Sequence, residues 1–224
     1  MIAVGIATIR GREESLKDVL TSLVPQTDLI FVSHSGDCRF ENLWPGKVVV
    51  IKATGTDERK FKGCRACRPG DVFFSCDDDL MYPADYVEKT MQGLKGDISI
   101  VTHHGRTIES PVKSYYKSWV NRYYCLGEQK DENAFVNVPG TGVTAFRIEA
   151  IQPKDEDFPK QFPLMADIHF GILAQKLKLQ IKVLTHPAGW IRQNPKADER
   201  HSIYSRQAGN ERLQVRRCNT ITWK

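Results

Sequence analysis

Residues 2–32 read IAVGIATIRGREESLKDVLTSLVPQTDLIFV, and this stretch decides the fold. It opens with an uninterrupted apolar run, residues 2–7, which is typical of a strand buried on both faces of a parallel sheet. A second apolar run, residues 29–32, predicts another strand. Between them, four apolar residues recur at helical spacing: Leu16, Val19, Leu20 and Leu23. Strand, helix and strand in this order indicate a βαβ unit.

The same reasoning extends along the chain. Short apolar runs predict further strands at residues 48–51, 72–75, 98–102, 143–146 and 181–184. Polar or amphipathic segments predict helices at residues 57–68, after Pro83, at 112–126 and at 167–178. In the segment 112–126, aromatic residues at helical spacing are interpreted as core packing. We therefore predict one α/β domain over residues 1–191, with a mostly parallel central sheet and helices on both faces.

Charge is unevenly distributed along the 224 residues. Lys and Arg number 32 against 27 Asp and Glu, a formal charge of +5. From Arg192 onward there are eight basic residues against three acidic ones, which accounts for the whole excess. We predict that residues 192–224 form a basic extension on or near the active site. Such a segment either attracts phosphates or nucleic acid or is simply a solvated terminus.

Hydrophobicity excludes several classes of protein. Apolar residues make up 41% of the chain, enough for a buried core without disulfide or metal staples. No apolar run approaches the roughly 20 residues that a membrane helix needs. The N-terminal segment carries Arg10 and Arg12 and no cleavage-site pattern. We therefore expect a cytoplasmic protein without a membrane span.

Three consecutive aspartates, Asp77, Asp78 and Asp79, follow the predicted strand 72–75. Ligands bind at the carboxyl ends of strands in open α/β sheets, and adjacent carboxylates at such a place call for a positive partner. A divalent cation held by Asp77 and Asp79 satisfies this need, with Asp78 facing elsewhere. The alternative is a solvated turn, or an N-cap for the helix that starts near Pro83.

At this point the sequence resembles the nucleotide-sugar glycosyltransferases of the GT-A fold, family 2 type, including bacterial and phage members. The resemblance covers residues 1–190 and rests on segments 4–8, 73–79 with 83–86, and 165–170, supported by 104–106, 138–143 and 189–190. It implies a Rossmann-like GT-A domain. It also implies metal-dependent transfer, with inversion, of a sugar from a nucleoside-diphosphate sugar, with UDP favoured, to a hydroxyl of a saccharide acceptor.

Site residues follow from this resemblance and from the chemistry of diphosphate departure. Mn²⁺ or Mg²⁺ would be held by Asp79, by Asp77 directly or through water, and by His186, although His186 is equally interpreted as a histidine satisfied in a turn. Asp167 would be the catalytic base, or else an N-cap. The expected donor-binding residues are Thr8, Arg10, His34, Lys62, Asp77, Asp78 and Arg192. The expected acceptor-side residues are His104, Gly140, Thr141, Gly142 and Trp190.

We also consider three other functions. The sequence does not determine the oligomeric state. The acceptor could be a hydroxylated base of phage DNA, or the chain could be a non-catalytic nucleic-acid-binding module that uses its basic extension. A nucleotidyltransferase making activated sugars shares the sheet and the aspartates. We discount it because such an enzyme is expected to carry a glycine-rich basic loop after the first strand, whereas residues 8–12, TIRGR, contain one glycine.

Overall fold

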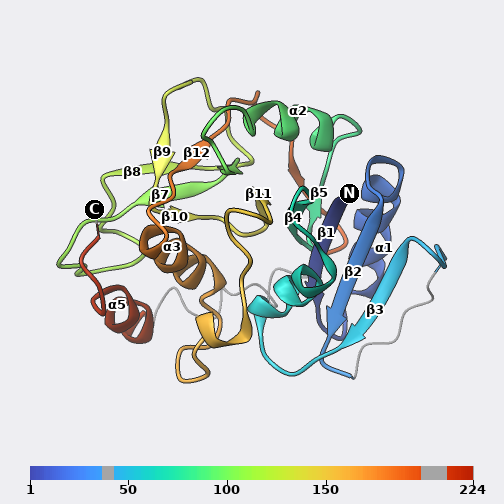
Figure 1. The fold of residues 1–224 in the computed structure, drawn as a ribbon, viewed down its shortest axis with the longest axis horizontal. Helices are drawn as coiled ribbons and strands as arrows, with labels where there is room; N and C mark the ends of the chain where they lie inside the picture. The colour runs from blue at the N-terminus through green and yellow to red at the C-terminus, as the bar shows by residue number, and fades with distance from the viewer. Residues whose placement is uncertain (37–42, 198–210, 224) are drawn as a thin grey trace.

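A computed structural model describes residues 1–36, 43–197 and 211–223, and its centre is an eight-stranded sheet (Figure 1). The strands are β1 (Ile2–Thr8), β2 (Leu29–His34), β3 (Val48–Lys52), β4 (Val72–Asp77), β6 (Ile100–Thr102), β9 (Phe135–Val136), β11 (Val143–Arg147) and β12 (Ile181–Val183). Their order across the sheet is β3-β2-β1-β4-β11-β6-β12-β9.

The first four of these strands are parallel to one another. β1 pairs with β2 on one side and with β4 on the other, so that Ala7 lies opposite Ser33 and Asp77. Strand β11 runs antiparallel to β4 and β6, and β12 returns parallel to β6. The carboxyl ends of β1 and β4 therefore meet at one edge of the sheet, next to the beginning of β11.

Helices cover both faces of this sheet, as predicted. Successive strand residues point to opposite faces, so Val4 and Phe74 join the core under α1 (Glu13–Leu23) and α2 (Tyr86–Gly93). Their neighbours Ala3 and Phe73 join the core under the 3₁₀ helix η2 (Asp57–Ala66) and α3 (Ala166–Lys176). Strands buried on both faces explain why the chain shows continuous apolar runs rather than alternation.

Two smaller sheets lie outside the eight-stranded sheet. β7 (Gly105–Thr107) pairs with β8 (Asn121–Tyr123) and with β10 (Val138–Pro139), and this three-stranded sheet lies beside α3 in Figure 1. β5 (Leu80–Met81), which follows the aspartates, pairs with β13 (Arg192–Gln193). Two further 3₁₀ helices are η1 (Val24–Gln26) and η3 (Asp155–Asp157).

The predicted C-terminal extension is described in part, because residues 198–210 and 224 lie outside the described residues. Beyond β13, the backbone N–H of Asn194 donates to the carbonyl of Asp79 at 2.8 Å. Helix α5 (Arg212–Cys218) packs against α3, and Cys218 and Trp223 are buried there.

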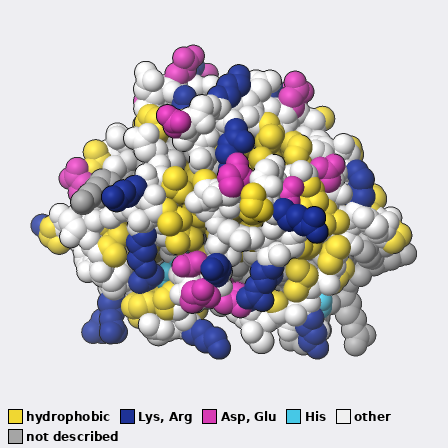
Figure 2. Space-filling model, viewed as in Figure 1, with side chains coloured by type: hydrophobic (Ala, Val, Ile, Leu, Met, Phe, Trp, Pro, Cys, Tyr) yellow, Lys and Arg dark blue, Asp and Glu magenta, His cyan; other side chains and the backbone are white. Residues whose placement is uncertain are grey.

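Figure 2 shows basic side chains spread among acidic and hydrophobic ones on one face rather than gathered in a single patch.

One predicted element is absent. The segment 112–126 is not a helix: it contains irregular turns and then β8. Strand pairing with β7 takes residues 121–123. The aromatic residues nevertheless pack on the core as interpreted, because Tyr116 and Trp119 lie against the buried cluster of α3 and α5. No helix in the described ranges is both long and apolar enough to cross a membrane.

Gly5 in β1 lets η2 lie directly on the sheet, and its replacement tests this close approach. A Cβ at Gly5 would lie 2.0 Å from the Lys60 carbonyl oxygen and 2.5 Å from Cζ of Phe73. We expect Gly5→Ala to lower the free energy of unfolding in urea by about 3 kcal/mol, because backbone and a packed ring must both move. Gly127→Ala, where the nearest atom is 3.4 Å away, is the control. Equal losses in both variants would contradict the close approach.

Candidate functional site

A cavity of about 1130 Å³ opens at the carboxyl ends of β1 and β4. One side is formed by the turn before α1, by η2 and by the aspartates after β4. The other side is formed by β7, β8 and the start of α3. This is the edge at which open α/β sheets bind ligands.

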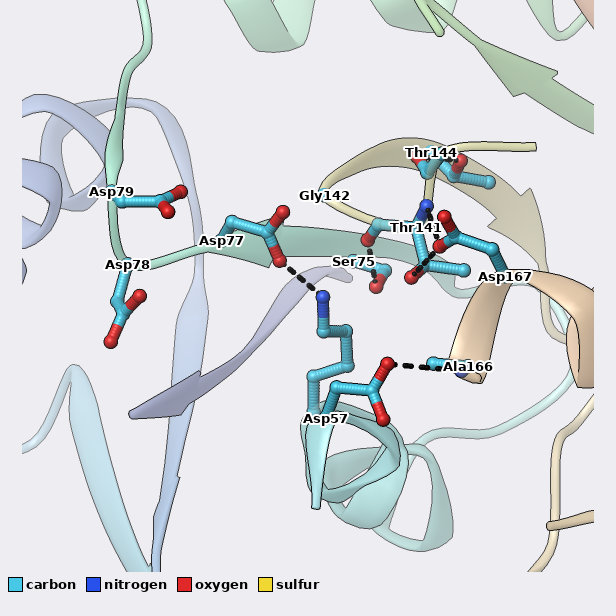
Figure 3. Close-up of polar contacts among 12 residues, drawn as sticks. Asp57, Ser75, Asp77, Asp78, Asp79, Thr141, Gly142, Thr144, Ala166 and Asp167 are labelled. Atoms are coloured by element: carbon cyan, nitrogen blue, oxygen red, sulfur yellow. Dashed lines mark hydrogen bonds and ion pairs between the residues drawn. The ribbon is translucent and has the colours of Figure 1, made fainter. Parts of the chain in front are cut away.

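The three aspartates have different surroundings (Figure 3). Asp78 is buried and accepts hydrogen bonds from Thr8 Oγ1 at 2.7 Å and from Arg12 Nη1 at 2.6 Å. The same Arg12 nitrogen donates to Asp79 Oδ2 at 2.8 Å. Asp77 forms an ion pair with the buried Lys60. The aspartates therefore neither cap α2 nor form a solvated turn, which removes the alternative interpretation of the triplet.

Burial and neighbouring charges shift the pKa values in the acidic cluster, which consists of Asp77, Asp78 and Asp79 with Arg12 and Lys60. Burial raises the pKa of Asp78 to about 6, despite the opposing effect of Arg12. Burial and the neighbouring charge of Asp77 raise the pKa of Asp79. Although burial disfavours the charge of Lys60, its pKa is raised because Asp77 and Asp57 stabilise the ammonium. The cluster is thus an acidic site held together by two cations from other elements.

The turn at residues 140–142 supports the cluster from β11. A Cβ at Gly142 would lie 1.9 Å from Asp77 Oδ2, so glycine is needed for this carboxylate to sit where it does. Tyr82 Oη accepts from the backbone N–H of Asp77 and donates to the Gly142 carbonyl, both at 2.7 Å. Asp77 is therefore fixed by contacts that leave its carboxylate on the cavity.

Asp167 also lines the cavity, at the start of α3. Its Oδ1 accepts from the backbone N–H of Thr141 at 2.8 Å and from Thr141 Oγ1 at 2.6 Å (Figure 3). It makes no capping bond to its own helix. Instead the N–H of Ala166 donates to Asp57 Oδ2 at 3.0 Å. Asp57 is a cavity-lining residue that the sequence analysis did not identify, because its partner is 109 positions away and no local motif marks it.

The structure brings together only some of the predicted site residues. Asp77, Asp78, Asp79, His104, Thr141 and Asp167 line the cavity, and Gly140 and Gly142 flank Thr141. Thr8 is buried beneath Asp78 rather than open to a ligand. The remaining predicted residues do not line the cavity: Arg10, His34, Lys62, Arg192, Trp190 and His186.

Most of these six residues have another partner or are exposed. Lys62 points away from the cavity to Asp155 at 2.6 Å, whereas Lys60, two positions earlier, enters it. Trp190 packs on Tyr86 and donates to Asp85. His34 Nδ1 accepts from the Gly36 N–H, while Arg10 and Arg192 are exposed.

His186 does not join the two aspartates in a metal site. It is buried, with Nε2 lying 3.3 Å from the His103 carbonyl oxygen. Within the described ranges no three His, Cys, Asp or Glu side chains gather in a way that could hold a metal. The predicted set of three ligands is therefore not assembled, because the chain after β12 places this histidine in the core beside Trp190.

Solved structures with this fold were found, although no protein-family model and no curated protein matches the chain. One is 4-diphosphocytidyl-2C-methyl-D-erythritol synthase from Anaerococcus prevotii. It is 12% identical, with a TM-score of 0.50, covering 96% of this chain and 98% of that one. Another is HddC from Yersinia pseudotuberculosis, 13% identical, with a TM-score of 0.53, covering 88% of this chain and 96% of that one. These likenesses confirm the α/β fold.

The comparison corrects the predicted sugar transferase. The Anaerococcus protein is named for making a diphosphocytidyl compound, which is a product of nucleotide transfer rather than of sugar transfer. The glycosyltransferase assignment, with its sugar donor and its saccharide or DNA acceptor, is therefore wrong. The loop after β1, which contains a single glycine, contributes Arg12 to the cavity.

The titration of Asp57 gives a pH test of the site. Burial raises its pKa from 3.8 to about 6. Between these values the folded state binds more protons than the unfolded state, so this group makes the free energy of unfolding fall as pH rises. We expect the parent to lose about 2 kcal/mol relative to Asp57→Asn between pH 4 and pH 6, measured by urea unfolding.

Asp155→Asn is the matched control for this measurement. Hydrogen bonding from Lys62 lowers the pKa of the exposed Asp155, so its contribution to stability is lost as pH falls and has the opposite sign. A constant difference between parent and Asp57→Asn over this pH range would show that the Asp57 carboxyl titrates normally.

Proposed function

We propose that this chain is a nucleotide-binding enzyme that transfers a nucleotidyl group from a nucleoside triphosphate to an acceptor. The observation that carries the proposal is the buried ammonium of Lys60, paired with Asp77 inside a cavity at the carboxyl ends of β1 and β4. The likeness of fold over nearly the whole chain agrees with it. Nucleotide phosphates at this edge would meet the ammonium of Lys60.

In the proposed reaction an acceptor oxygen forms a bond to the α-phosphorus. The bond between the α-phosphorus and the bridging oxygen breaks, and diphosphate leaves with that electron pair. Lys60 would bind phosphate oxygens by charge-assisted hydrogen bonds and stabilise the negative charge on the leaving group. Asp167, oriented by Thr141, would accept the proton that the acceptor hydroxyl loses as its oxygen bonds to phosphorus. Arg12 would position Asp78 and Asp79 without acting on the substrate itself.

A divalent cation fits the two remaining carboxylates. Asp79 points toward Asp77 in Figure 3. The charge of Asp77 contributes to the raised pKa of Asp79, so the two carboxylates repel each other, and a bound cation would relieve this repulsion. Mg²⁺ commonly uses one or two carboxylates together with substrate phosphates, so a third protein ligand is not required. When bound, Mg²⁺ or Mn²⁺ would act as a Lewis acid on phosphate oxygens.

The two lysines of η2 provide a matched test of the phosphate role. We expect Lys60→Met to weaken binding of Mg²⁺-nucleoside triphosphates at least about tenfold, because a charge-assisted bond in a buried site is lost. Lys62→Met should stay within about twofold of the parent, because Lys62 pairs with Asp155 outside the cavity. Isothermal titration with CTP, UTP, ATP and GTP measures both, and circular dichroism checks folding. No binding of any nucleotide by the parent, or equal effects of both substitutions, would refute the proposal.

The aspartates provide a separate test of the cation. We expect the parent to bind the preferred triphosphate more tightly with Mg²⁺ than with a chelator, and Asp77→Asn and Asp79→Asn to lose most of that difference. Glu88→Gln on the exposed side of α2 is the control and should keep it. Manganese titration followed by electron paramagnetic resonance gives a readout that is independent of turnover. Unchanged Mn²⁺ binding in both Asp variants would place the cation elsewhere.

A further inference from the structure

The chain returns to the acidic cluster through residues 191–197, long after it has left it. Ile191 is fully buried in the core beneath α1 and α2. The next two residues form β13, which is the only strand paired with β5 in the described part of the chain. Because β5 begins directly after Asp79, this pairing holds the end of the turn that carries the aspartates.

Asn194 connects this strand to α1. The residue has no exposed surface, and its backbone N–H donates to the Asp79 carbonyl oxygen at 2.8 Å. Its side-chain Nδ2 donates to the Ser15 carbonyl oxygen at 3.2 Å, and its Oδ1 accepts from the backbone N–H of Lys196 at 2.9 Å. Removing a buried amide of this kind is costly, because its partners lose their hydrogen bonds away from water. One residue therefore fixes the aspartate turn against the first turn of α1.

The beginning of α1 also carries the cation that binds Asp79. Ser15 Oγ donates to the Arg12 carbonyl oxygen at 3.0 Å, and the Arg12 guanidinium donates to Asp79 Oδ2 at 2.8 Å. Asp79 is thus attached to this part of the chain at two points, through its carboxylate by Arg12 and through its carbonyl by Asn194. Two attachments to one residue restrict its rotation more than either does alone.

Asp79 needs this restriction because it faces a like charge. Its carboxylate points toward Asp77 in Figure 3, and Asp77 is fixed separately by Tyr82. The Asp79 side chain is 19% exposed, so it borders on water into which a less constrained carboxylate can turn. Repulsion from Asp77 favours that rotation when no cation is bound. The direction of the Asp79 carboxylate therefore depends on what holds the backbone that carries it.

We propose that Asn194 is a positioning residue for the cation site: it holds the Asp79 backbone against α1, so that the Asp79 carboxylate stays directed at Asp77. Asn194 is not among the residues that line the cavity, so it acts through Asp79. The inference rests on the proposed function for the cation between the two carboxylates. Its consequence is that the cation affinity of the pocket depends on a side chain outside the pocket.

Titration of Mn²⁺ into the full chain, followed by electron paramagnetic resonance, tests this role. We expect Asn194→Ala to weaken Mn²⁺ binding at least about fivefold, because the Asp79 turn loses its tie to α1. Asn194→Asp has the same shape but cannot donate to Ser15, and it places a carboxylate near Asp18, so it should weaken binding at least as much. Lys196→Met is the matched control from the same segment. It should bind Mn²⁺ like the parent, because the Lys196 side chain pairs with Asp18 at the surface.

A double-mutant cycle separates positioning from a general loss of structure. We expect Asn194→Ala to lower the free energy of unfolding in urea both in the parent and in the Asp79→Asn background. Its effect on Mn²⁺ affinity should be confined to the parent background, because Asn194 acts through the Asp79 carboxylate. An equal fall in Mn²⁺ affinity in both backgrounds would show a structural role only and would overturn the inference.

The remaining outcomes separate the positioning role from the function on which it rests. Loss of Mn²⁺ binding in Asp77→Asn and Asp79→Asn, with parental affinity in both Asn194 variants, would overturn the positioning role and leave the cation site intact. An equal loss in Lys196→Met would also overturn it. Should Asn194→Ala fail to fold, the isosteric Asn194→Asp carries the test. If the parent binds Mn²⁺ with the expected dependence on Asn194 but binds no nucleoside triphosphate, the proposed nucleotidyl transfer fails and the positioning role stands.

Discussion

The pairing of Lys60 and Arg12 with three adjacent carboxylates is the interaction on which the pocket depends. Three aspartates in sequence at the end of β4 would repel one another, most strongly at Asp78, which is buried. Two cations from different elements remove this difficulty: Arg12 precedes α1, and Lys60 belongs to η2. The same pairing joins the first βα connection, the 3₁₀ helix and β4 around one edge of the sheet. The charged groups therefore link three elements of the fold, in addition to the ligand roles proposed for them.

The acid cluster alone does not distinguish sugar transfer from nucleotide transfer. Both reactions involve phosphates near a cation, and both suit carboxylates at the end of a parallel strand. One solved structure with this fold carries a name that refers to nucleotide transfer, and at 12% identity the likeness shows the fold alone. Three cations line the cavity besides Arg12 and Arg59: Lys60, Arg106 and Arg122.

The backbone of this fold is readable from the sequence, whereas the contacts that build the site are mostly not. Continuous apolar runs predicted β1, β2 and β4 with only small errors at their ends, because burial on both faces leaves a clear pattern. The acidic triplet was placed at the sheet edge for the same reason. Lys62 was predicted at the site and Lys60 is found there, because the packing of η2 on β1 and β2, which the local sequence does not specify, decides which lysine enters the cavity. Aromatic spacing at 112–126 suggested a helix, but pairing with β7 overrode this local preference.

The hydrogen bond from Asn194 to the carbonyl of Asp79, together with the β13–β5 pair, has a consequence for biosynthesis. The strands that carry the aspartates leave the ribosome early, long before residues 192–194 exist. The turn that presents Asp79 therefore remains without its final backbone partner until residues 192–194 have been made. A nascent chain can complete most of its sheet while the pocket is still unfinished, and shortening the protein from its C-terminal end would damage the pocket before it damages the sheet.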